Sequence, residues 1–236
     1  LHKIDHMTYL DGMEAIDSDI MDKVLEHLRE YDYRQYTAQD VQRALVKEQL
    51  SIDDYAAVLS PAAMPYLEQM AQRALQETRK HFGNSVHLFT PLYIANYCEN
   101  LCAYCGFNYK NRIRRGKLSA DELEKELQAI AETGLQDILI LTGESRRQSG
   151  PAYIGEAVKM AAKYFYSVSL EIYPLNIDEY KFLHECGADY VCVYQETYNP
   201  DKYDEVHVDG PKRVYPYRFH AQERALMAGM RGVAFG

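Results

Sequence analysis

Hydrophobic and polar positions alternate differently in the two parts of the chain, and the change falls near residue 82. Before it, apolar residues recur three and four positions apart behind hydroxyl or carboxylate residues, which is typical of amphipathic helices. Helices are predicted in the stretches 20–28, 37–45, 51–55 and 65–81. We therefore expect residues 1–82 to form an N-terminal helical region.

After residue 82, short apolar runs alternate with helical patterns. Strands are predicted at 86–94, 138–141, 168–172, 190–194 and 232–235, and helices at 119–133, 151–164, 178–186 and 217–228. Repeated strand–helix units with almost wholly apolar strands indicate a parallel sheet covered by helices. The pattern predicts an α/β fold for residues 83–236, either doubly wound or closed as a barrel.

Composition narrows the functional classes. Among the 236 residues, 47% are apolar and 26% are charged, which favours a globular protein over a disordered or membrane-spanning one. The formal net charge of −9 argues against a general affinity for nucleic acid, and we expect neither nucleic acid nor a membrane as a partner. Five cysteines, an odd number, and no visible signal or membrane-spanning pattern predict a reducing, cytoplasmic location.

Three of these cysteines, Cys98, Cys102 and Cys105, lie within eight residues in a C-x3-C-x2-C arrangement. Cysteine thiolates are the preferred ligands of iron–sulfur clusters. Three thiolates leave one iron of a 4Fe-4S cluster without a protein ligand, so that iron is open to a small molecule. The spacing therefore predicts a cluster that takes part in chemistry.

Two other interpretations of these cysteines remain. A structural zinc site usually has four protein ligands, and no cysteine or histidine follows Cys105 within about ten residues. A disulfide framework would conflict with the reducing location. The other two cysteines, Cys186 and Cys192, lie among apolar residues, and we assign them no role.

With Tyr104 as the aromatic residue, the segment reads C-x3-C-x-aromatic-C, and it resembles the signature of radical S-adenosylmethionine (SAM) enzymes. The resemblance implies that the open iron binds the amino and carboxylate groups of SAM. It also implies that the reduced cluster cleaves SAM to a 5'-deoxyadenosyl radical. The fold it implies is a TIM-like barrel, which this chain would contain in part, truncated after about the fifth strand.

The resemblance further assigns SAM contacts at the carboxyl ends of the strands. Tyr104 belongs to the signature itself. Gly143 and Glu144 follow the second predicted strand and resemble the Gly-Gly-Glu motif that binds the SAM amino group, although Thr-Gly-Glu alone could be an ordinary turn. Gln195 or Glu196, after the fourth predicted strand, would hold the ribose hydroxyls.

Two charged residues complete the candidate SAM site. Glu171 interrupts an apolar strand, and an unpaired buried carboxylate is costly, so we expect it to face the barrel lumen and a ligand unless the strand is an exposed edge. Arg218 is implied by the resemblance as the partner of the SAM carboxylate, since a guanidinium binds a carboxylate in a bidentate manner. Arg218 and Arg224 could equally be surface residues.

A narrower resemblance extends from about residue 36 to residue 236. The segments Tyr104-Cys105-Gly106-Phe107, Leu141-Thr142-Gly143-Glu144 and Gln195-Glu196-Thr197-Tyr198 are similar to those of the radical SAM tyrosine lyases, and most to the 2-iminoacetate synthase family of thiamine biosynthesis. The implied reaction cleaves the Cα–Cβ bond of L-tyrosine to 2-iminoacetate and p-cresol for thiazole formation. The implied partners are L-tyrosine, a thiazole synthase and an electron donor of the flavodoxin or ferredoxin type.

Three alternatives remain open. The tyrosine lyases that mature the iron-only hydrogenase resemble the chain less closely and make carbon monoxide and cyanide. A non-catalytic cluster carrier or electron-transfer protein could use the same thiolates, and a binding module could use them to hold zinc. Spectral change on addition of SAM, and metal analysis after anaerobic reconstitution, separate these classes.

Overall fold

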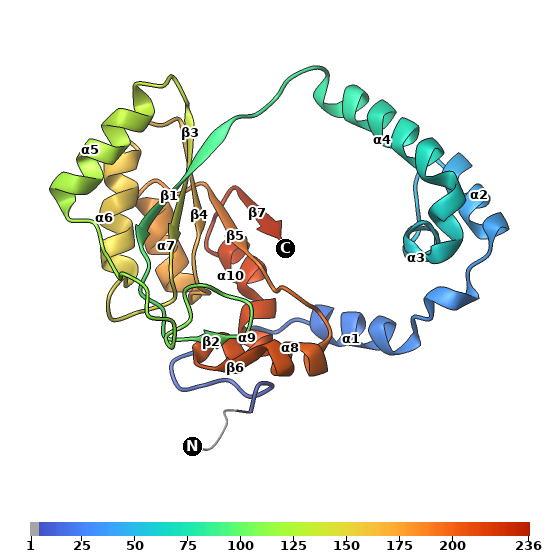
Figure 1. The fold of residues 1–236 in the computed structure, drawn as a ribbon, viewed down its shortest axis with the longest axis horizontal. Coiled ribbons are helices and arrows are strands. Elements are labelled where there is room, and N and C mark those ends of the chain that lie inside the picture. Colours follow the sequence, from blue (N-terminus) through green and yellow to red (C-terminus); the bar gives the residue numbers. More distant parts are fainter. Residues whose placement is uncertain (1–4) are drawn as a thin grey trace. The chain divides into compact units, whose positions relative to one another are not determined.

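The computed structural model describes residues 5–236 and contains a parallel five-stranded sheet (Figure 1). The strand order is β1-β3-β4-β5-β7, and every neighbouring pair is parallel. These strands are β1 (Phe89–Ala95), β3 (Asp137–Thr142), β4 (Ser167–Glu171), β5 (Tyr190–Val193) and β7 (Gly232–Phe235). The predicted α/β fold with a parallel sheet is thus confirmed.

Helices join successive strands and cover the sheet. They are α5 (Ala120–Ala131), α6 (Pro151–Ala161), α7 (Ile177–Glu185), α9 (Tyr215–Phe219) and α10 (Ala221–Met227), with a short α8 (Pro200–Val206) before α9. Helix α5 contacts α6, α6 contacts α7, and α7 contacts α10, so these four helices form one row against the sheet. The core between this row and the strands is made of aliphatic side chains such as Ile140, Ile154 and Leu170, all fully buried.

Strand register brings the site residues into one row. Parallel pairing places Tyr93 opposite Leu141, Leu141 opposite Glu171, and Glu171 opposite Cys192. Residues paired across parallel strands point to the same face of the sheet. Tyr93, Leu141, Glu171 and Cys192 therefore share one face of the sheet near its carboxyl edge.

A second, two-stranded sheet was not predicted from the sequence. It pairs β2 (Leu101–Cys102) antiparallel with β6 (His207–Asp209), which is followed by η3 (Pro211–Arg213). These strands are too short to show a periodic pattern, and they pair only because the tertiary fold brings them together. The small sheet fixes the second cysteine against a segment about 100 residues later in the chain.

Internal contacts divide the described chain into two units. One unit contains residues 5–25 and Leu88–Gly236, and the other is Glu26–His87. The boundary expected at residue 82 stays a prediction, and residues 5–25 belong to the unit that contains the sheet. They are held there by hydrogen bonds from the Glu14 amide to Asn176 Oδ1 (3.0 Å) and from Ser18 Oγ to Glu223 Oε1 (2.7 Å).

The unit Glu26–His87 is helical. Its elements are η1 (Tyr33–Gln35), α2 (Ala38–Val46), α3 (Ile52–Leu59), η2 (Pro61–Tyr66) and α4 (Leu67–Phe82), after α1 (Ile20–Glu30), which begins before the unit. Two of these helices begin with a capping box, Thr37 with Asp40 and Ser51 with Asp54. Helices therefore occur where the hydroxyl-led apolar patterns predicted them.

The prediction of one continuous helix at 217–228 is wrong. The chain forms α9 and α10, separated at His220, whose backbone (φ −87°, ψ 11°) leaves the helical conformation. Its imidazole Nδ1 lies 2.5 Å from Glu223 Oε2 in the first turn of α10. The break lets α9 and α10 take separate directions.

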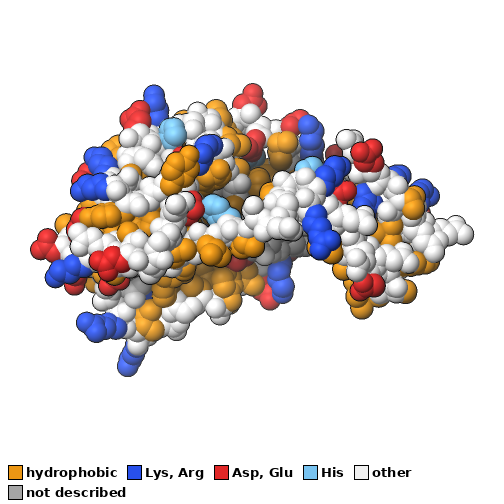
Figure 2. Space-filling model, turned by 90° about the horizontal axis from the view of Figure 1, so that it is seen from above, with side chains coloured by type: hydrophobic (Ala, Val, Ile, Leu, Met, Phe, Trp, Pro, Cys, Tyr) orange, Lys and Arg blue, Asp and Glu red, His pale blue; other side chains and the backbone are white. Residues whose placement is uncertain are grey.

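None of the helices in residues 5–236 combines the length and apolar character that a bilayer crossing requires. Basic and acidic side chains are interspersed over the face of the molecule in Figure 2. That face presents no large area of a single charge.

Candidate active site

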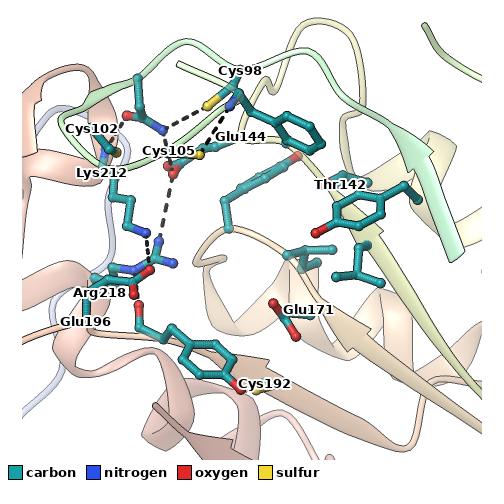
Figure 3. A pocket seen from close by; sticks show the side chains of 18 residues that line it. Cys98, Cys102, Cys105, Thr142, Glu144, Glu171, Cys192, Glu196, Lys212 and Arg218 are labelled. Carbon is teal, nitrogen blue, oxygen red and sulfur yellow. Dashed lines mark hydrogen bonds and ion pairs between the residues drawn. The ribbon is translucent and has the colours of Figure 1, made fainter. Parts of the chain in front are cut away.

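One pocket lies at the carboxyl edge of the sheet, where the strand ends meet the cysteine segment (Figure 3). Its volume is about 330 Å³, within the range of small-molecule sites. All three clustered thiols line it, together with polar groups from the ends of β3, β4 and β5 and from the segment after β6. The charged and thiol side chains on its wall are Cys98, Cys102, Cys105, Glu144, Glu171, Cys192, Glu196, Lys212 and Arg218.

Backbone hydrogen bonds hold the cysteine segment against the sheet. The Glu99 amide donates to the Glu144 carbonyl (2.8 Å), and the Gly143 amide donates to the carbonyl of Ala95 (3.0 Å). The Arg115 guanidinium donates to the carbonyls of Asn96 (2.7 Å) and Phe107 (2.9 Å), on either side of the cysteines. The loop is therefore fixed by main-chain contacts at both of its ends.

Asn100, which the sequence analysis did not single out, connects three parts of the pocket. Its side chain is 1% exposed. The amide Nδ2 donates to Glu144 Oε2 (2.8 Å) and lies 3.6 Å from the Cys98 sulfur, while Oδ1 accepts from the Lys212 amide (2.7 Å). One buried amide side chain thus joins the cysteine loop to the end of β3 and to η3.

Gly143 lies where no side chain fits. A Cβ atom built there would be 2.2 Å from the Tyr97 carbonyl oxygen, far inside van der Waals contact. The end of β3 and the cysteine loop approach each other this closely only because the position is glycine. The sequence analysis associated Gly143 with SAM, and the structure adds a packing reason for the residue.

Arg218 and Glu144 face each other across one side of the pocket. Arg218 Nη1 is 3.8 Å from Glu144 Oε2. The Arg218 side chain is largely buried; Nε donates to the Tyr194 carbonyl (2.6 Å), but buried Nη1 has no hydrogen-bond partner. Such an orphaned guanidinium nitrogen is costly unless an anion binds it, so this wall of the pocket suits a carboxylate ligand. The surface alternative for Arg218 is excluded.

Arg224 is also buried, contrary to the surface alternative. It is 0% exposed, its Nε donates to the Leu175 carbonyl (2.8 Å), and its guanidinium lies 4.0 Å from the centre of the Tyr217 ring. Arg224 does not line the pocket with the cysteines. Its contacts are those of a structural residue.

Glu171 points into the pocket from the end of β4, as expected from its place in an apolar strand. Its carboxylate has no hydrogen bond or ion pair with the residues that the structure describes. Burial raises the pKa of Glu171, and the nearby Glu196 carboxylate raises it further. The carboxylate is therefore available to a ligand that donates hydrogen bonds.

Glu196 and Gln195 are oriented differently. Glu196 lines the pocket and forms an ion pair with Lys212, whose Nζ lies 2.8 Å from Oε1. Gln195 is buried outside the pocket, and neither of its side-chain polar atoms has a partner among residues 5–236. Of the two polar residues expected at the end of β5, the structure brings only Glu196 to the pocket.

Tyr104 does not line the pocket either. Its hydroxyl lies 2.8 Å from His207 Nε2, and its ring packs edge-on against the His207 ring. Burial lowers the pKa of His207 to about 3, so its imidazole is neutral. Tyr104 thus connects the cysteine loop to β6 outside the pocket.

The thiols suit a cluster more than a single ion. Burial raises the pKa of the Cys102 thiol to about 11, although the Lys212 charge opposes this, so a thiolate there needs positive charge from bound metal. Among the described residues, no three His, Cys, Asp or Glu side chains converge on one ion position. A 4Fe-4S cube attaches each thiolate to a separate iron and needs no such convergence.

Comparison with known proteins agrees with this donor set. Residues 92–235 match the family model for the radical SAM superfamily. The chain belongs to the radical SAM superfamily. Members use a 4Fe-4S cluster and SAM, which confirms the predicted cofactors, and the TIM-like radical SAM fold is confirmed with them.

Three relatives indicate where in the superfamily the chain lies. It is 42% identical over 200 residues to 2-iminoacetate synthase of Escherichia coli K12, covering 85% of this chain and 53% of that enzyme. It is 34% identical to 3-methylornithine synthase of Methanosarcina acetivorans, covering 68% of this chain and 46% of that enzyme. The crystal structure of HydG, a maturase of the FeFe-hydrogenase, superposes with a TM-score of 0.83 at 27% identity over 93% of this chain and 50% of that one.

The chain spans about half the length of the curated relatives it matches. The range matched by the family model, residues 92–235, includes the cysteine segment and the strand ends described above.

The close approach at Gly143 gives a first testable prediction. In the G143A variant, the added methyl group forces the end of β3 away from the Tyr97 carbonyl, and we expect a loss of about 1–3 kcal/mol in the free energy of unfolding. Chemical denaturation of the metal-free protein measures it. The matched control is G106A in the same loop, where a Cβ meets nothing within 4 Å, and we expect a change below about 0.5 kcal/mol. Equal effects of the two variants would contradict the packing argument.

Proposed function

We propose that the enzyme containing this chain is a radical SAM lyase that cleaves the Cα–Cβ bond of L-tyrosine to 2-iminoacetate and p-cresol. The proposal rests on one pocket that is lined by the three clustered thiols and by the cations Lys212 and Arg218. The chain that forms this pocket is 42% identical to a 2-iminoacetate synthase. In this proposal, Cys98, Cys102 and Cys105 hold the cluster. When bound, the cluster and SAM supply a 5'-deoxyadenosyl radical that abstracts hydrogen from the substrate.

The pocket walls offer complementary groups for SAM. Arg218, with its unpartnered Nη1, would bind the SAM carboxylate. Glu144 lies next to it and would accept hydrogen bonds from the SAM amino group together with the backbone at Gly143. Glu171 and Glu196 face the same space and would accept hydrogen bonds from the ribose hydroxyls. The guanidinium would thus bind the carboxylate of SAM, and the three carboxylates would bind its amino group and its ribose hydroxyls.

The pocket also shields the reaction. Aromatic and apolar side chains, among them Tyr93, Phe107 and Ile172, line it between the charged groups. Such a wall excludes water from a reactive radical. The proposal includes L-tyrosine as substrate, a thiazole synthase as the recipient of 2-iminoacetate, and a flavodoxin or ferredoxin as electron donor.

A second candidate is the hydrogenase-maturation activity. The fold similarity to HydG, with a TM-score of 0.83, favours it. Both candidates share the cleavage of tyrosine, and they differ in what becomes of the glycine-derived fragment. The identity of 42% to 2-iminoacetate synthase, against 27% to HydG, is the reason for our preference.

The assignment of the cluster ligands gives the second prediction. Serine replacement of Cys98, Cys102 or Cys105 in the intact enzyme should reduce iron content after anaerobic reconstitution and bring 5'-deoxyadenosine formation to background. The matched control is C186S, because Cys186 is buried at the end of α7 outside the pocket. Wild-type iron content and deoxyadenosine formation in all three pocket variants would refute the assignment. A cluster that forms but does not respond to SAM would instead indicate a carrier protein.

Arg218 gives the third prediction. In R218Q, loss of a charge-assisted hydrogen bond should weaken SAM binding about 10- to 100-fold while leaving iron content unchanged. Equilibrium dialysis with reconstituted enzyme measures the dissociation constant. The control R231Q changes a half-exposed arginine that pairs with Asp189 outside the pocket, and it should bind SAM as the wild type does. Unchanged affinity in R218Q would exclude Arg218 from the SAM site.

Product analysis tests the reaction itself and is the fourth prediction. The intact enzyme, incubated anaerobically with SAM, L-tyrosine and a reductant, should yield p-cresol and glyoxylate, the hydrolysis product of 2-iminoacetate. Chromatography of both compounds measures it, with the C98S variant as the blank. Carbon monoxide and cyanide among the products would favour the hydrogenase-maturation activity. Deoxyadenosine without p-cresol would leave a radical SAM enzyme with another substrate.

A further inference from the structure

A partly buried ion pair lies next to the cysteine segment and is separate from Arg218 and Glu144, and its carboxylate is also one of those proposed to bind the SAM ribose. It consists of Lys212 and Glu196, and we call it the Lys212–Glu196 pair. Lys212 Nζ is 2.8 Å from Glu196 Oε1, and the two side chains are 12% and 32% exposed. Both line the pocket with the three clustered thiols (Figure 3). A lysine ammonium at this depth is unusual and costly, so its position calls for a reason.

The lysine is held at a fixed place relative to the cysteine segment. Its backbone amide donates to Asn100 Oδ1 (2.7 Å), and Asn100 lies two residues from Cys98 and two from Cys102. Gly210, with φ +97°, permits this contact, because a Cβ there would be 2.5 Å from Asn100 Oδ1. The Lys212 Nζ lies 5.6 Å from the centre of the Tyr104 ring, on the same segment.

The glutamate is held by a strained backbone. Glu196 has φ +71° and is the one non-glycine residue with positive φ among residues 5–236. This conformation costs about 1–3 kcal/mol for a residue such as glutamate, and it persists where the surroundings impose it, often at functional sites. The strain directs the Glu196 carboxylate to Lys212 at the end of β5.

The charges of the pair act on the cysteine segment with opposite signs. Lys212 and Glu196 line the same pocket as Cys98, Cys102 and Cys105, one with a cation and the other with a carboxylate. Burial and the nearby Arg218 charge lower the pKa of Lys212, and the Glu196 carboxylate opposes that shift. A charge that is partly shielded from solvent influences its neighbours more than a fully exposed charge does.

We propose that the Lys212–Glu196 pair sets the reduction potential of the cluster, with Lys212 stabilising the reduced state and Glu196 limiting that stabilisation. Reduction moves one electron from an external one-electron donor to the cluster; no bond forms or breaks, and the cluster with its thiolates gains one negative charge. A nearby cation favours the more negative state and a nearby carboxylate disfavours it. The inference rests on the proposed cluster at Cys98, Cys102 and Cys105, but not on the substrate.

The test measures the midpoint potential of the reconstituted intact enzyme without SAM or tyrosine. Dithionite titration is followed by electron paramagnetic resonance of the reduced cluster. In K212Q, reduction should become about tenfold less favourable, which is about 59 mV more negative for one electron. In E196Q, the shift should have the opposite sign, the double variant should lie between the two, and K212R should stay near the wild type.

The matched controls are K202Q and E205Q, which change an exposed lysine–glutamate pair (2.6 Å) on the neighbouring α8. Because solvent screens that pair, neither control should shift the potential measurably.

Opposite signs in the two pocket variants would support the proposal, because a merely structural role would not reverse with the sign of the charge removed. Shifts of the same sign in K212Q and E196Q, or shifts no larger than those of the controls, would overturn it. If K212Q takes up no cluster, E196Q alone tests the proposal: a more positive midpoint potential supports it, and a more negative or unchanged one overturns it. Failure of the tyrosine-lyase proposal would leave these potentials unaffected, whereas loss of the cluster assignment would show as wild-type iron content in the cysteine variants.

Discussion

The close approach of the cysteine loop to the end of β3 is the contact on which the rest of the site depends. Gly143 touches the Tyr97 carbonyl where any side chain would collide, and the Glu99 amide donates to the carbonyl of Glu144. Through this contact, three thiols from one loop and polar groups from three strand ends face the same space. A sheet whose strands all run in one direction makes this possible, because their carboxyl ends meet at one edge.

Inside the pocket, the balance of charges follows from the cost of burial. Two cations, Lys212 and Arg218, lie among three carboxylates, and only one close ion pair, between Lys212 and Glu196, is fully formed. Within residues 5–236, buried Arg218 Nη1 has no hydrogen-bond partner, and the half-buried Glu171 carboxylate makes no hydrogen bond or ion pair. Buried groups that the protein leaves unsatisfied are suited to a ligand carrying the complementary charges.

Most of the fold and part of the site follow from local sequence patterns. Strand and helix order, the cysteine spacing, and the position of Glu171 in an apolar strand depend on neighbouring residues, and reasoning from sequence captured them. Asn100 and Lys212 depend on β2 meeting β6, two very short strands about 100 residues apart, and no local pattern indicates that pairing. The sequence also left open whether Gln195 or Glu196 faces the pocket, because the left-handed backbone conformation at Glu196 is not visible in a local pattern.

The hydrogen bonds of Asn100 join only protein groups: a carboxylate, a thiol sulfur and a backbone amide. The bonds from the Arg115 guanidinium to the carbonyls of Asn96 and Phe107 are likewise internal to the chain. The loop therefore loses its conformational freedom when the polypeptide folds, and insertion of iron and sulfide has little left to order. A loop held in this way is preorganised for the cluster, so less conformational entropy is lost when iron and sulfide bind.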